Sequence, residues 1–527
     1  MDGAESFLSH PLGALLLSFI LAYLIIDSVL AQRIAQANPK CPLVGSSVSF
    51  MPMFVHNVLY LFKAAIHTQT GYNAFQKRAF QLLRYEGSVL ILPHTVLEEL
   101  VSLPETIASG QAALSIDLAG PFTGLDLIVE NRLQNIIIQR RLTPKLPLLI
   151  PRLEQSANDA FDAHFPARVG EWTEVRPFFL LKHVSASLAA DILVGSNLRD
   201  DPAWLDLSAK FTEDVFLTSM VLHMFPRWMQ KIVYPFVPSY WRTRACFRTA
   251  RQILGPEIER LIQRHDAGAW EPRDDHVDDL NVLRWLCGQA QANDRNVDII
   301  SHNLVLLVLA SVHNGLFRIL SVLYDLVAAG PELTNQLIAE IADEMDRGWK
   351  DMPYERLYRL DSVLCESQRL SPPAALGMKR LFKQPHTFQD GTYVAAGTYA
   401  CMATFAIEND PAHTPNPGKY DGLRRFRAMK SQLQSGRKEE HAMARAYQFS
   451  SPTPTALSWG YGKSACPGRH FASCIIKIVL VKLLADYEFA FPPGTGRPRN
   501  RNVYDFTFIS PSHRLLIRPK QHPMRVF

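Results

Sequence analysis

The chain has 527 residues, of which 47% are hydrophobic and 20% charged, and this excludes a disordered, collagen-like or coiled-coil protein as a description of the whole molecule. Its 55 Lys and Arg residues against 50 Asp and Glu residues give a net charge of +5, which is too small to favour nucleic-acid binding. The seven scattered cysteines do not form a disulfide framework, so we expect a reducing compartment.

The first predicted element is an apolar helix near the N-terminus, at about residues 12–30. At ~1.5 Å per residue it is about 28 Å long, close to the ~30 Å hydrocarbon core of a bilayer. Asp2 and Glu5 precede it and Arg33 follows it, which argues against a cleaved signal peptide and places the following chain in the cytoplasm. We therefore expect residues 1–31 to form a membrane anchor with one transmembrane helix. A buried core helix is the alternative.

The rest of the chain is predicted to form one mainly α unit with a minor β part. Residues 32–45 contain prolines, which fix φ, and are expected to form a hinge. No repeat or linker divides residues 46–527, although ~150 residues per domain would suggest three or four domains. The apolar spacing is helical from about residue 120 to 370, and turn signals predict short strands over residues 376–404. A final apolar helix is predicted over Phe471–Leu484.

Cys466 lies in the most informative segment, residues 459–469, with the sequence WGYGKSACPGR. Gly462 and Gly468 allow the backbone to turn sharply around the sulfur and to approach a flat ligand closely. A cysteine just before a helix has its thiolate favoured by the helix dipole, and Arg469 adds positive charge. A buried apolar cysteine is the alternative reading. Zinc is a poor reading, because no CxxC partner is present.

This segment resembles the haem-binding loop of the cytochrome P450 superfamily, which runs Phe-x-x-Gly-x-x-x-Cys-x-Gly. Gly462, Cys466 and Gly468 match the pattern, and Trp459 stands at the phenylalanine position, where an aromatic ring would still shield the sulfur. The resemblance implies that the Cys466 thiolate is the axial ligand of the iron of haem b.

A second motif lies about 100 residues upstream, where Glu366-Ser-Gln-Arg369 matches the Glu-x-x-Arg helix motif of the family. The spacing places both side chains on one helix face, where an exposed pair would contribute well under ~1 kcal/mol. In the family the pair is buried and is joined by an arginine that precedes the cysteine loop. Arg424 is the expected third member, and Arg425 is the alternative. The resemblance implies a structural role for the three residues.

The expected contacts to the haem propionates depart from the family in two places. Ser464 stands where the family usually has His or Arg, whereas Arg380 aligns with a residue that commonly contacts a propionate. The usual Trp-x-x-x-Arg helix motif is absent. Asn135 and Gln139 fall at the nearest register, and the adjacent Arg140 is a weaker candidate for this contact.

The predicted central helix, Ile299–Val327, carries the sequence Ala310-Ser-Val-His313-Asn314. The family usually has an acid and an alcohol at the last two positions, which deliver protons during dioxygen activation. His313 and Asn314 occupy these positions and are candidates for distal proton delivery, since histidine exchanges protons near neutral pH. Alternatively, His313 packs against backbone or water. Relatives that rearrange peroxides also lack the alcohol.

The resemblance implies a cytochrome P450 fold and a monooxygenase that inserts one oxygen atom from O2 into a lipophilic substrate. Its partners would be that substrate, the membrane and an NADPH–cytochrome P450 reductase, which supplies NADPH-derived electrons. We expect a single-pass protein of the endoplasmic reticulum membrane with a cytoplasmic catalytic domain. A basic docking face for the reductase is expected at Lys463, Arg469 and Lys477, although a solvated surface explains Lys477 equally well.

Two segments, Leu142-Thr-Pro-Lys-Leu146 and Tyr420-Asp-Gly-Leu-Arg424, resemble filamentous-fungal members of the superfamily. They favour a role in secondary metabolism, with a terpenoid or polyketide-derived substrate. The substrate pocket is expected around Phe216–Phe225, Leu306–Asn314 and Ala374–Met378. The alternatives are a haem-thiolate isomerase or peroxide-rearranging enzyme that needs no reductase, and a membrane-tethered protein that binds haem without turnover.

Overall fold

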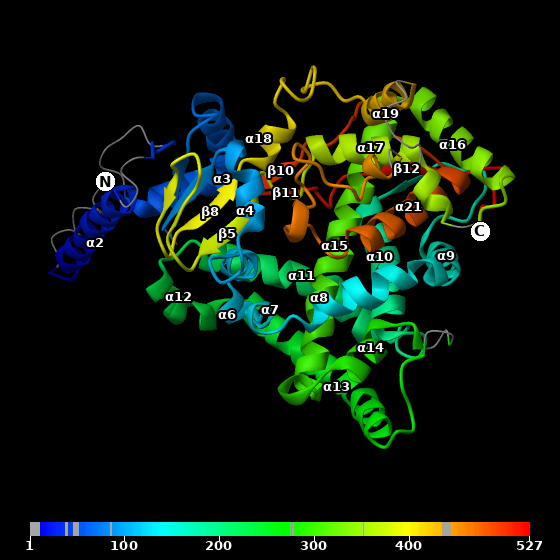
Figure 1. The fold of residues 1–527 in the computed structure, drawn as a ribbon, viewed down its shortest axis with the longest axis horizontal. Coiled ribbons are helices and arrows are strands. Elements are labelled where there is room, and N and C mark those ends of the chain that lie inside the picture. The colour runs from blue at the N-terminus through cyan, green and yellow to red at the C-terminus, as the bar shows by residue number, and fades with distance from the viewer. Residues whose placement is uncertain are drawn as a thin grey trace.

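The computed structural model shows a mainly α body with a smaller β-rich part at the end where the N-terminus lies (Figure 1). It describes residues 11–36, 41–45, 52–84, 87–273, 276, 279–350, 352–434 and 444–527. Residues 1–10 of the expected anchor and residues 37–40 of the expected hinge lie outside the described residues.

Helix α15, Val297–Ala329, runs through the middle of the helical part (Figure 1). Asn296 begins it, because its side chain accepts a hydrogen bond from the backbone N–H of Ile299 at 2.9 Å. Gly330, with φ of 91°, ends it. The helix is apolar around most of its circumference, so it is buried between its neighbours α10, α11, α13 and α21. It extends two residues beyond the predicted helix at each end.

The other helices follow the chain around α15. Those that matter for the site are α3 Met53–Ala74, α5 Gly110–Asp117, α8 Leu133–Ile137, α10 Pro177–Val194, α11 Pro202–Leu222, α12 Arg227–Val233, α13 Pro238–Asp266, α14 Val282–Gln289, α16 Pro331–Asp346, α17 Tyr358–Leu370, α18 Thr404–Glu408, α19 Arg424–Gln434 and α21 Arg469–Asp486. Helix α21 contains the predicted final helix. It begins three residues after Cys466, so the cysteine precedes a helix as the sequence predicts.

The β-rich part is built on a five-stranded sheet with the order β1-β2-β8-β5-β3. Its strands are β1 Phe80–Arg84, β2 Gly87–Leu92, β3 Ala108–Ser109, β5 Gly377–Phe382 and β8 Tyr399–Met402. Only β2 and β8 are parallel, and the register shifts within β5 between Gly377 and Arg380. Strands β5 and β8 fall in the predicted region 376–404, whereas β1, β2 and β3 were not predicted.

Smaller strand groups complete the β structure. They are the sheet of β4 Thr173–Val175, β12 Leu515–Pro519 and β9 Tyr487–Ala490, and the hairpins β6 His386–Thr387 with β7 Tyr393–Val394 and β10 Arg501–Val503 with β11 Phe506–Phe508. The β10–β11 hairpin lies near α11, since Phe506 and Phe508 both pack edge-on against Phe216.

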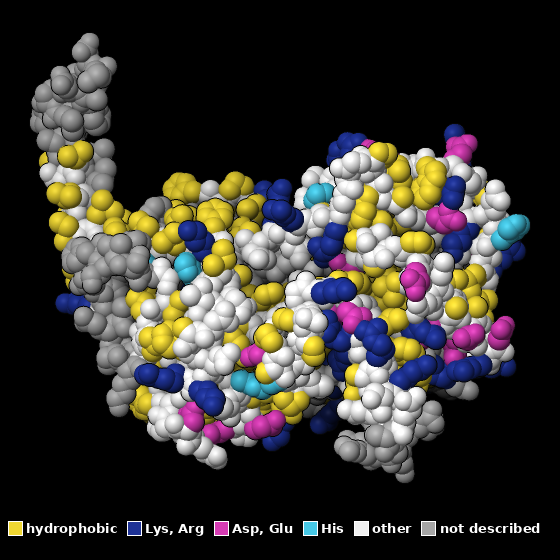
Figure 2. Space-filling model, turned by 90° about the horizontal axis from the view of Figure 1, so that it is seen from above, with side chains coloured by type: hydrophobic (Ala, Val, Ile, Leu, Met, Phe, Trp, Pro, Cys, Tyr) yellow, Lys and Arg dark blue, Asp and Glu magenta, His cyan; other side chains and the backbone are white. Residues whose placement is uncertain are grey.

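Helix α2, Pro11–Gln36, packs in part against α3, β1 and β2, and elsewhere it extends away from the body and presents apolar side chains to its surroundings (Figures 1 and 2). Leu17, Phe19 and Leu21 are between 54% and 76% exposed. Among the described residues, the helices long and apolar enough to cross a membrane are α10 and α15, whereas the apolar stretch of α2, Leu17–Val29, is shorter. Of the apolar segments of α10 and α15, 72% and 67% are buried inside the body. They are therefore explained as core helices of the body.

Candidate functional site

The cysteine loop is a tight turn whose shape depends on glycine. The backbone N–H of Cys466 donates to the carbonyl of Trp459 at 2.7 Å and closes the loop. Gly460 and Gly462 have φ of 77° and 55°, in the left-handed region that favours glycine. A Cβ atom on Gly460 would lie 2.6 Å from the Ser464 carbonyl oxygen, so a side chain there would force the loop apart.

Burial dominates the electrostatics of Cys466. It raises the pKa of the thiol, while the N–H groups of Gly468 and Arg469 and the charge of Arg469 lower it by less. The helix start therefore favours the thiolate as expected, but it is the weaker effect. A metal cation bound at the sulfur would supply the counter-charge that a buried thiolate requires.

Trp459 and Arg469 fix the loop to the segment before it. The Trp459 indole Nε1 donates to the Phe449 carbonyl at 2.9 Å, and the two rings meet edge to face at 5.3 Å. The Arg469 guanidinium donates to the carbonyls of Cys466 at 3.0 Å and Ser450 at 3.1 Å. Both side chains are thus engaged within the loop region, and the shielding of the sulfur by Trp459 stays a prediction.

The Glu-x-x-Arg pair is buried and joined by the expected third residue. Glu366 lies 2.6 Å from Arg369 on α17 and 3.2 Å from Arg424 at the start of α19. Arg369 also donates to the Pro417 carbonyl at 2.7 Å, which ties α17 to the irregular stretch before the cysteine loop. Arg425 instead points to the Cys365 sulfur at 3.2 Å. Arg424, rather than Arg425, therefore completes the trio.

Arg380 on β5 is directed to the cysteine loop. It is 7% exposed, and its guanidinium donates to the Lys379 carbonyl at 2.8 Å and to the Ser464 hydroxyl. Among the described residues no carboxylate lies within ion-pair distance of it, and burial lowers its pKa more than the charge of Glu105 raises it. A buried guanidinium in this state is suited to an anionic ligand.

Arg140 lies elsewhere. It is exposed on the π-helical turn Ile138–Leu142 that follows α8, in a hollow shared with Arg141 and lined by Gly288, Gln289 and Gln291 of the α14 region. Within the described parts of the chain, no hydrogen bond or ion pair joins Arg140 to the cysteine loop. Its assignment to a propionate stays a prediction.

The distal candidates on α15 face two directions. Ala310 and Asn314 are exposed one turn apart in the middle of a helix whose other exposed residues lie near its ends, so this face borders an open space. The Asn314 amide donates to the Ala310 carbonyl at 3.1 Å. His313 is 3% exposed, and its Nε2 lies 3.5 Å from a carboxylate oxygen of Glu213 on α11. The side-chain partner of His313 is thus a carboxylate rather than only backbone or water.

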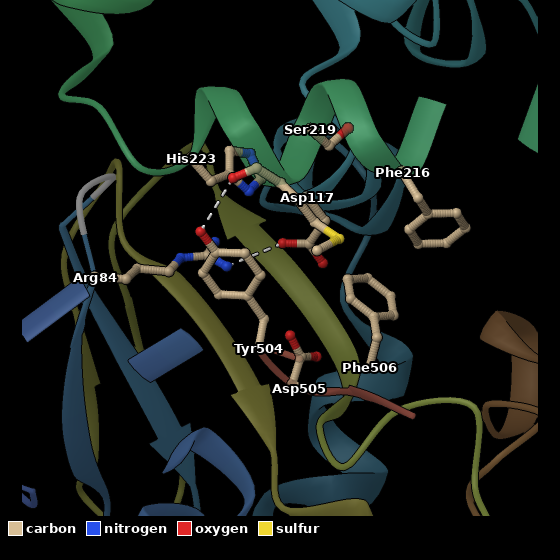
Figure 3. A pocket seen from close by; sticks show the side chains of 9 residues that line it. Arg84, Asp117, Phe216, Ser219, His223, Tyr504, Asp505 and Phe506 are labelled. Carbon is tan, nitrogen blue, oxygen red and sulfur yellow. Dashed lines mark hydrogen bonds and ion pairs between the residues drawn. The ribbon is translucent and has the colours of Figure 1, made fainter. Parts of the chain in front are cut away.

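A small cavity of about 10 Å³, with room for roughly one water molecule, lies between α11, the sheet and the β10–β11 hairpin (Figure 3). It is lined by apolar and charged side chains, namely Phe216, Met220, Phe506, Arg84, Asp117 and Asp505, with Ser219, His223 and Tyr504. Phe216, Met220 and His223 belong to the expected pocket segment Phe216–Phe225.

A buried charge cluster forms one wall of this cavity. Lys379 Nζ lies 2.7 Å from Asp117 and 2.6 Å from Asp505, and Arg84 lies 3.1 Å from Asp117. Burial would raise the pKa of Asp117, but Lys379 and Arg84 outweigh it and hold the pKa at about 2. The cluster contains two cations and two anions, so it suits a neutral ligand better than a charged one.

Comparison with known proteins decides the family. The cytochrome P450 family model matches residues 124–517. A cytochrome P450 monooxygenase of Emericella nidulans is 33% identical over 91% of this chain and 88% of its own length. The chain belongs to the cytochrome P450 superfamily. The monooxygenase AtmP of Aspergillus flavus is 32% identical over 94% of this chain and 92% of its own, and an ent-kaurene oxidase of Gibberella intermedia is 29% identical over 92% and 89%. The chain is thus a cytochrome P450 monooxygenase of fungal type.

Membership of the P450 superfamily implies a haem whose iron is bound by a cysteine thiolate. Three features of the chain fit such a group. Cys466 is held on a glycine-dependent turn, Arg380 is a buried cation without a carboxylate partner among the described residues, and the Ala310–Asn314 face of α15 borders open space. A Cβ atom on Gly468 would meet nothing within 4 Å, so the loop leaves room beside the cysteine.

Lys477 was expected on the reductase-docking face of this P450, and that prediction is wrong because the side chain is buried. It is 3% exposed, and its Nζ lies 2.7 Å from Asp361 and donates to the Tyr354 carbonyl at 2.7 Å. Neither a docking role nor a solvated surface fits a buried lysine. Its position on the inner face of α21, which is apolar on most sides, explains why it needs this ion pair. Lys463 in the loop is exposed.

Several residues of the P450 site were missed from the sequence. Glu213 contacts His313, which lies 100 positions later in the chain, and Lys182, which lies 31 positions earlier. No local motif marks Glu213 or Lys182. Lys379 had a usable signal, because it directly precedes Arg380 in a strand and successive residues of a strand face opposite sides of a sheet. That alternation predicts that Lys379 faces away from the cysteine loop. The charge cluster with Asp117 and Asp505 lies on that opposite side of the strand.

Proposed function

We propose that this P450 is a membrane-anchored monooxygenase that oxidises a lipophilic intermediate of fungal secondary metabolism, such as a terpenoid or polyketide-derived molecule. The observation that carries the haem-thiolate part is Cys466 on its glycine turn, with the buried Arg380 guanidinium bonded to Ser464 beside it. The relatives named monooxygenases and ent-kaurene oxidase support the oxidation of a small molecule.

Each residue of the site then has a proposed role toward haem b. Cys466 would bind the iron, with Trp459, Gly462 and Gly468 shaping the loop around the sulfur. Arg380, with Ser464, would bind one propionate, and Arg140 is a weaker candidate for the other. When bound, the haem activates dioxygen with NADPH-derived electrons that arrive through a reductase. Lys463 belongs to the surface on which this reductase is proposed to dock.

On the distal side, the chain's own residues would orient the substrate and manage protons. The apolar side chains of Phe216 and Phe506 would exclude water from a lipophilic substrate. His313 would hold a proton on an imidazole nitrogen, and the Asn314 amide would bind water on the open face of α15. Glu366, Arg369 and Arg424 would take no chemical part, because they pair with one another within the proximal framework.

One observation favours a second candidate, a haem-thiolate isomerase or peroxide-rearranging enzyme. Asn314 replaces the alcohol of the distal helix and donates its amide to Ala310 of the same helix. An enzyme that starts from a peroxide needs no reductase and no proton delivery to dioxygen. Turnover of a peroxide substrate without reductase and NADPH would favour this candidate.

The exposed apolar side chains support attachment to a membrane. They lie along α2 and on the segment from α12 to α13, where Trp228, Ile232 and Phe236 are 60% to 81% exposed. We propose that residues 1–31 anchor the protein in the endoplasmic reticulum membrane as a single pass, that residues 32–45 form a hinge, and that the catalytic domain, residues 46–527, lies in the cytoplasm.

The first experiment is the carbon monoxide difference spectrum of the dithionite-reduced protein, compared with the Cys466→Ser variant. We expect a strongly red-shifted Soret band that the variant loses, because only a thiolate ligand produces that shift. Cys246→Ser is the matched control, since Cys246 is half-buried on α13 and distant in sequence from the loop, and it should keep the band. A band typical of histidine ligation, or folded protein without haem, would overturn the proposal.

A further inference from the structure

Three ionisable side chains meet where α10, α11 and α15 pack together. Glu213 of α11 accepts a hydrogen bond from Lys182 Nζ of α10 at 2.6 Å, and the same oxygen lies 3.5 Å from His313 Nε2 of α15. Lys182 and His313 are buried, whereas half of the Glu213 side chain is exposed. The distal helix thus lacks a carboxylate of its own at position 313, and a neighbouring helix brings one to that position.

The Glu213 carboxylate faces one of the two ring nitrogens of His313, Nε2. Burial would raise the pKa of Glu213, but the hydrogen bonds from His313 and Lys182 outweigh it and hold the pKa at about 2. Glu213 is therefore ionised at neutral pH and only accepts hydrogen bonds, so His313 must place its proton on Nε2 to bond with it. His313 Nδ1 is buried and has no hydrogen-bond partner among the described residues.

We propose that Glu213 is a positioning residue for His313, and that Lys182 holds Glu213 in place. This deepens the proposed monooxygenase function and rests on it. Glu213 holds the ring in the form with a proton on Nε2, which leaves Nδ1 as the nitrogen that accepts a proton from one water molecule and passes that proton to a second water molecule. The imidazolium formed in between is neutralised by Glu213. One proton enters and one leaves, so the step needs no oxidant or reductant.

The test uses the full-length protein labelled with 15N-histidine. The His313 signals are assigned by their loss in His313→Gln, and the nitrogen shifts then report which nitrogen carries the proton. In Glu213→Gln we expect the ratio of the Nε2–H to the Nδ1–H form to fall about tenfold, the change expected when a hydrogen bond to a charged acceptor becomes one to a neutral amide oxygen. Glu174→Gln is the matched control, because it removes a half-exposed carboxylate from a distant ion pair with Arg514.

A second readout is the coupling of NADPH use to product. Glu213→Gln should lower coupled product formation about tenfold and raise peroxide release, with KM unchanged, because substrate contacts are intact. Lys182→Met should produce a smaller change in the same direction, and it tests the proposal if Glu213→Gln does not fold. An unchanged His313 proton ratio in both variants would overturn the proposal.

Failure of the positioning role of Glu213 can be told apart from failure of the proposed monooxygenase function. A wild-type protein without the red-shifted carbon monoxide band would refute the haem-thiolate enzyme, whatever the histidine signals show. A protein with that band in wild type and Glu213→Gln, but with the same His313 proton ratio in both, would refute only the positioning role of Glu213.

Discussion

At the scale of single residues, Glu366 stands out because one buried carboxylate pairs with two arginines. It is 3% exposed and accepts hydrogen bonds from Arg369 and Arg424, and the backbone N–H of Asp421 donates to it at 3.0 Å. An exposed pair of this kind would contribute little, but removal of one partner from a buried pair leaves an uncompensated charge. Burial is what turns a common sequence motif into a structural requirement.

We therefore expect Glu366→Gln to lower the free energy of unfolding by about 3–5 kcal/mol. The variant keeps the size of the side chain and loses only the charge, so the loss measures the uncompensated arginines. Denaturant unfolding of the purified protein gives the value, and the haem content should fall in parallel. Arg425→Ala, one residue from Arg424 but outside the trio, should cost less than ~1 kcal/mol. Equal effects of the two variants would contradict the assignment.

At the scale of elements, Glu408 joins α18 to the segment that leads into the cysteine loop. One of its oxygens accepts hydrogen bonds from the backbone N–H groups of Leu457 at 2.6 Å and Ser458 at 2.9 Å, and from the Ser458 hydroxyl at 3.0 Å. The side chain is almost fully buried. Burial raises the pKa of Glu408 from its usual 4.5 to about 7, and the hydrogen bonds lower it by less.

Because the pKa of Glu408 is raised, the contribution of this side chain to the stability of the fold depends on pH. A carboxyl whose folded pKa is raised stabilises the fold below its unfolded pKa of 4.5, and this stability is lost as the pH rises to about 7. A shift of this size corresponds to roughly 3 kcal/mol. Glu408→Gln keeps an accepting oxygen and does not titrate. We expect its stability relative to wild type to rise by about that amount between pH 4.5 and 7.5 in denaturant unfolding. A constant difference across this range would contradict the pKa.

Most helices of the second half could be predicted because their apolar period is local. The amphipathic pattern of α16 and the apolar run of α21 mark each helix within a few residues of its ends. Strand β1, with the sequence FQLLR, is buried at all five positions and shows no alternation. Its neighbour β2 pairs with β8, which lies about 300 residues later in the chain, so no local pattern reports that sheet.

The residues of the site also divide into those that a local sequence motif marks and those that only the packing of helices brings together. Cys466, Glu366 and Arg369 could be found because each lies in a short motif whose spacing is visible in the sequence. Glu213 is joined to the site only by the packing of α11 against α15, and nothing near it in sequence marks its role. Lys477 was wrongly assigned to the surface, because a lysine in an apolar helix gives no sign of a buried partner such as Asp361.

At the scale of the whole molecule, exposed apolar side chains gather at the β-rich end of the body. Helices α2, α3 and α12 all lie at this end (Figure 1). Phe62 on α3, Trp228 on α12 and Phe236 just after it are 62% to 81% exposed. Exposed aromatic residues of this size are costly in water, and an amphipathic aromatic side chain such as tryptophan suits a membrane surface. The body itself is therefore expected to touch the membrane in which we propose that residues 1–31 anchor the protein.

Deletion of residues 1–36 should then weaken membrane binding without abolishing it. Burial of one large aromatic side chain is worth about 1.5–3 kcal/mol, so Trp228→Ser with Phe236→Ser in the deleted protein should lower the remaining binding to lipid vesicles by at least ~10-fold. Co-sedimentation with phosphatidylcholine–phosphatidylserine vesicles measures it. Trp172→Ser is the matched control, because Trp172 is 43% exposed beside β4. Equal binding of the control and the double variant, both in the deleted protein, would show that these aromatic side chains do not contact the lipid.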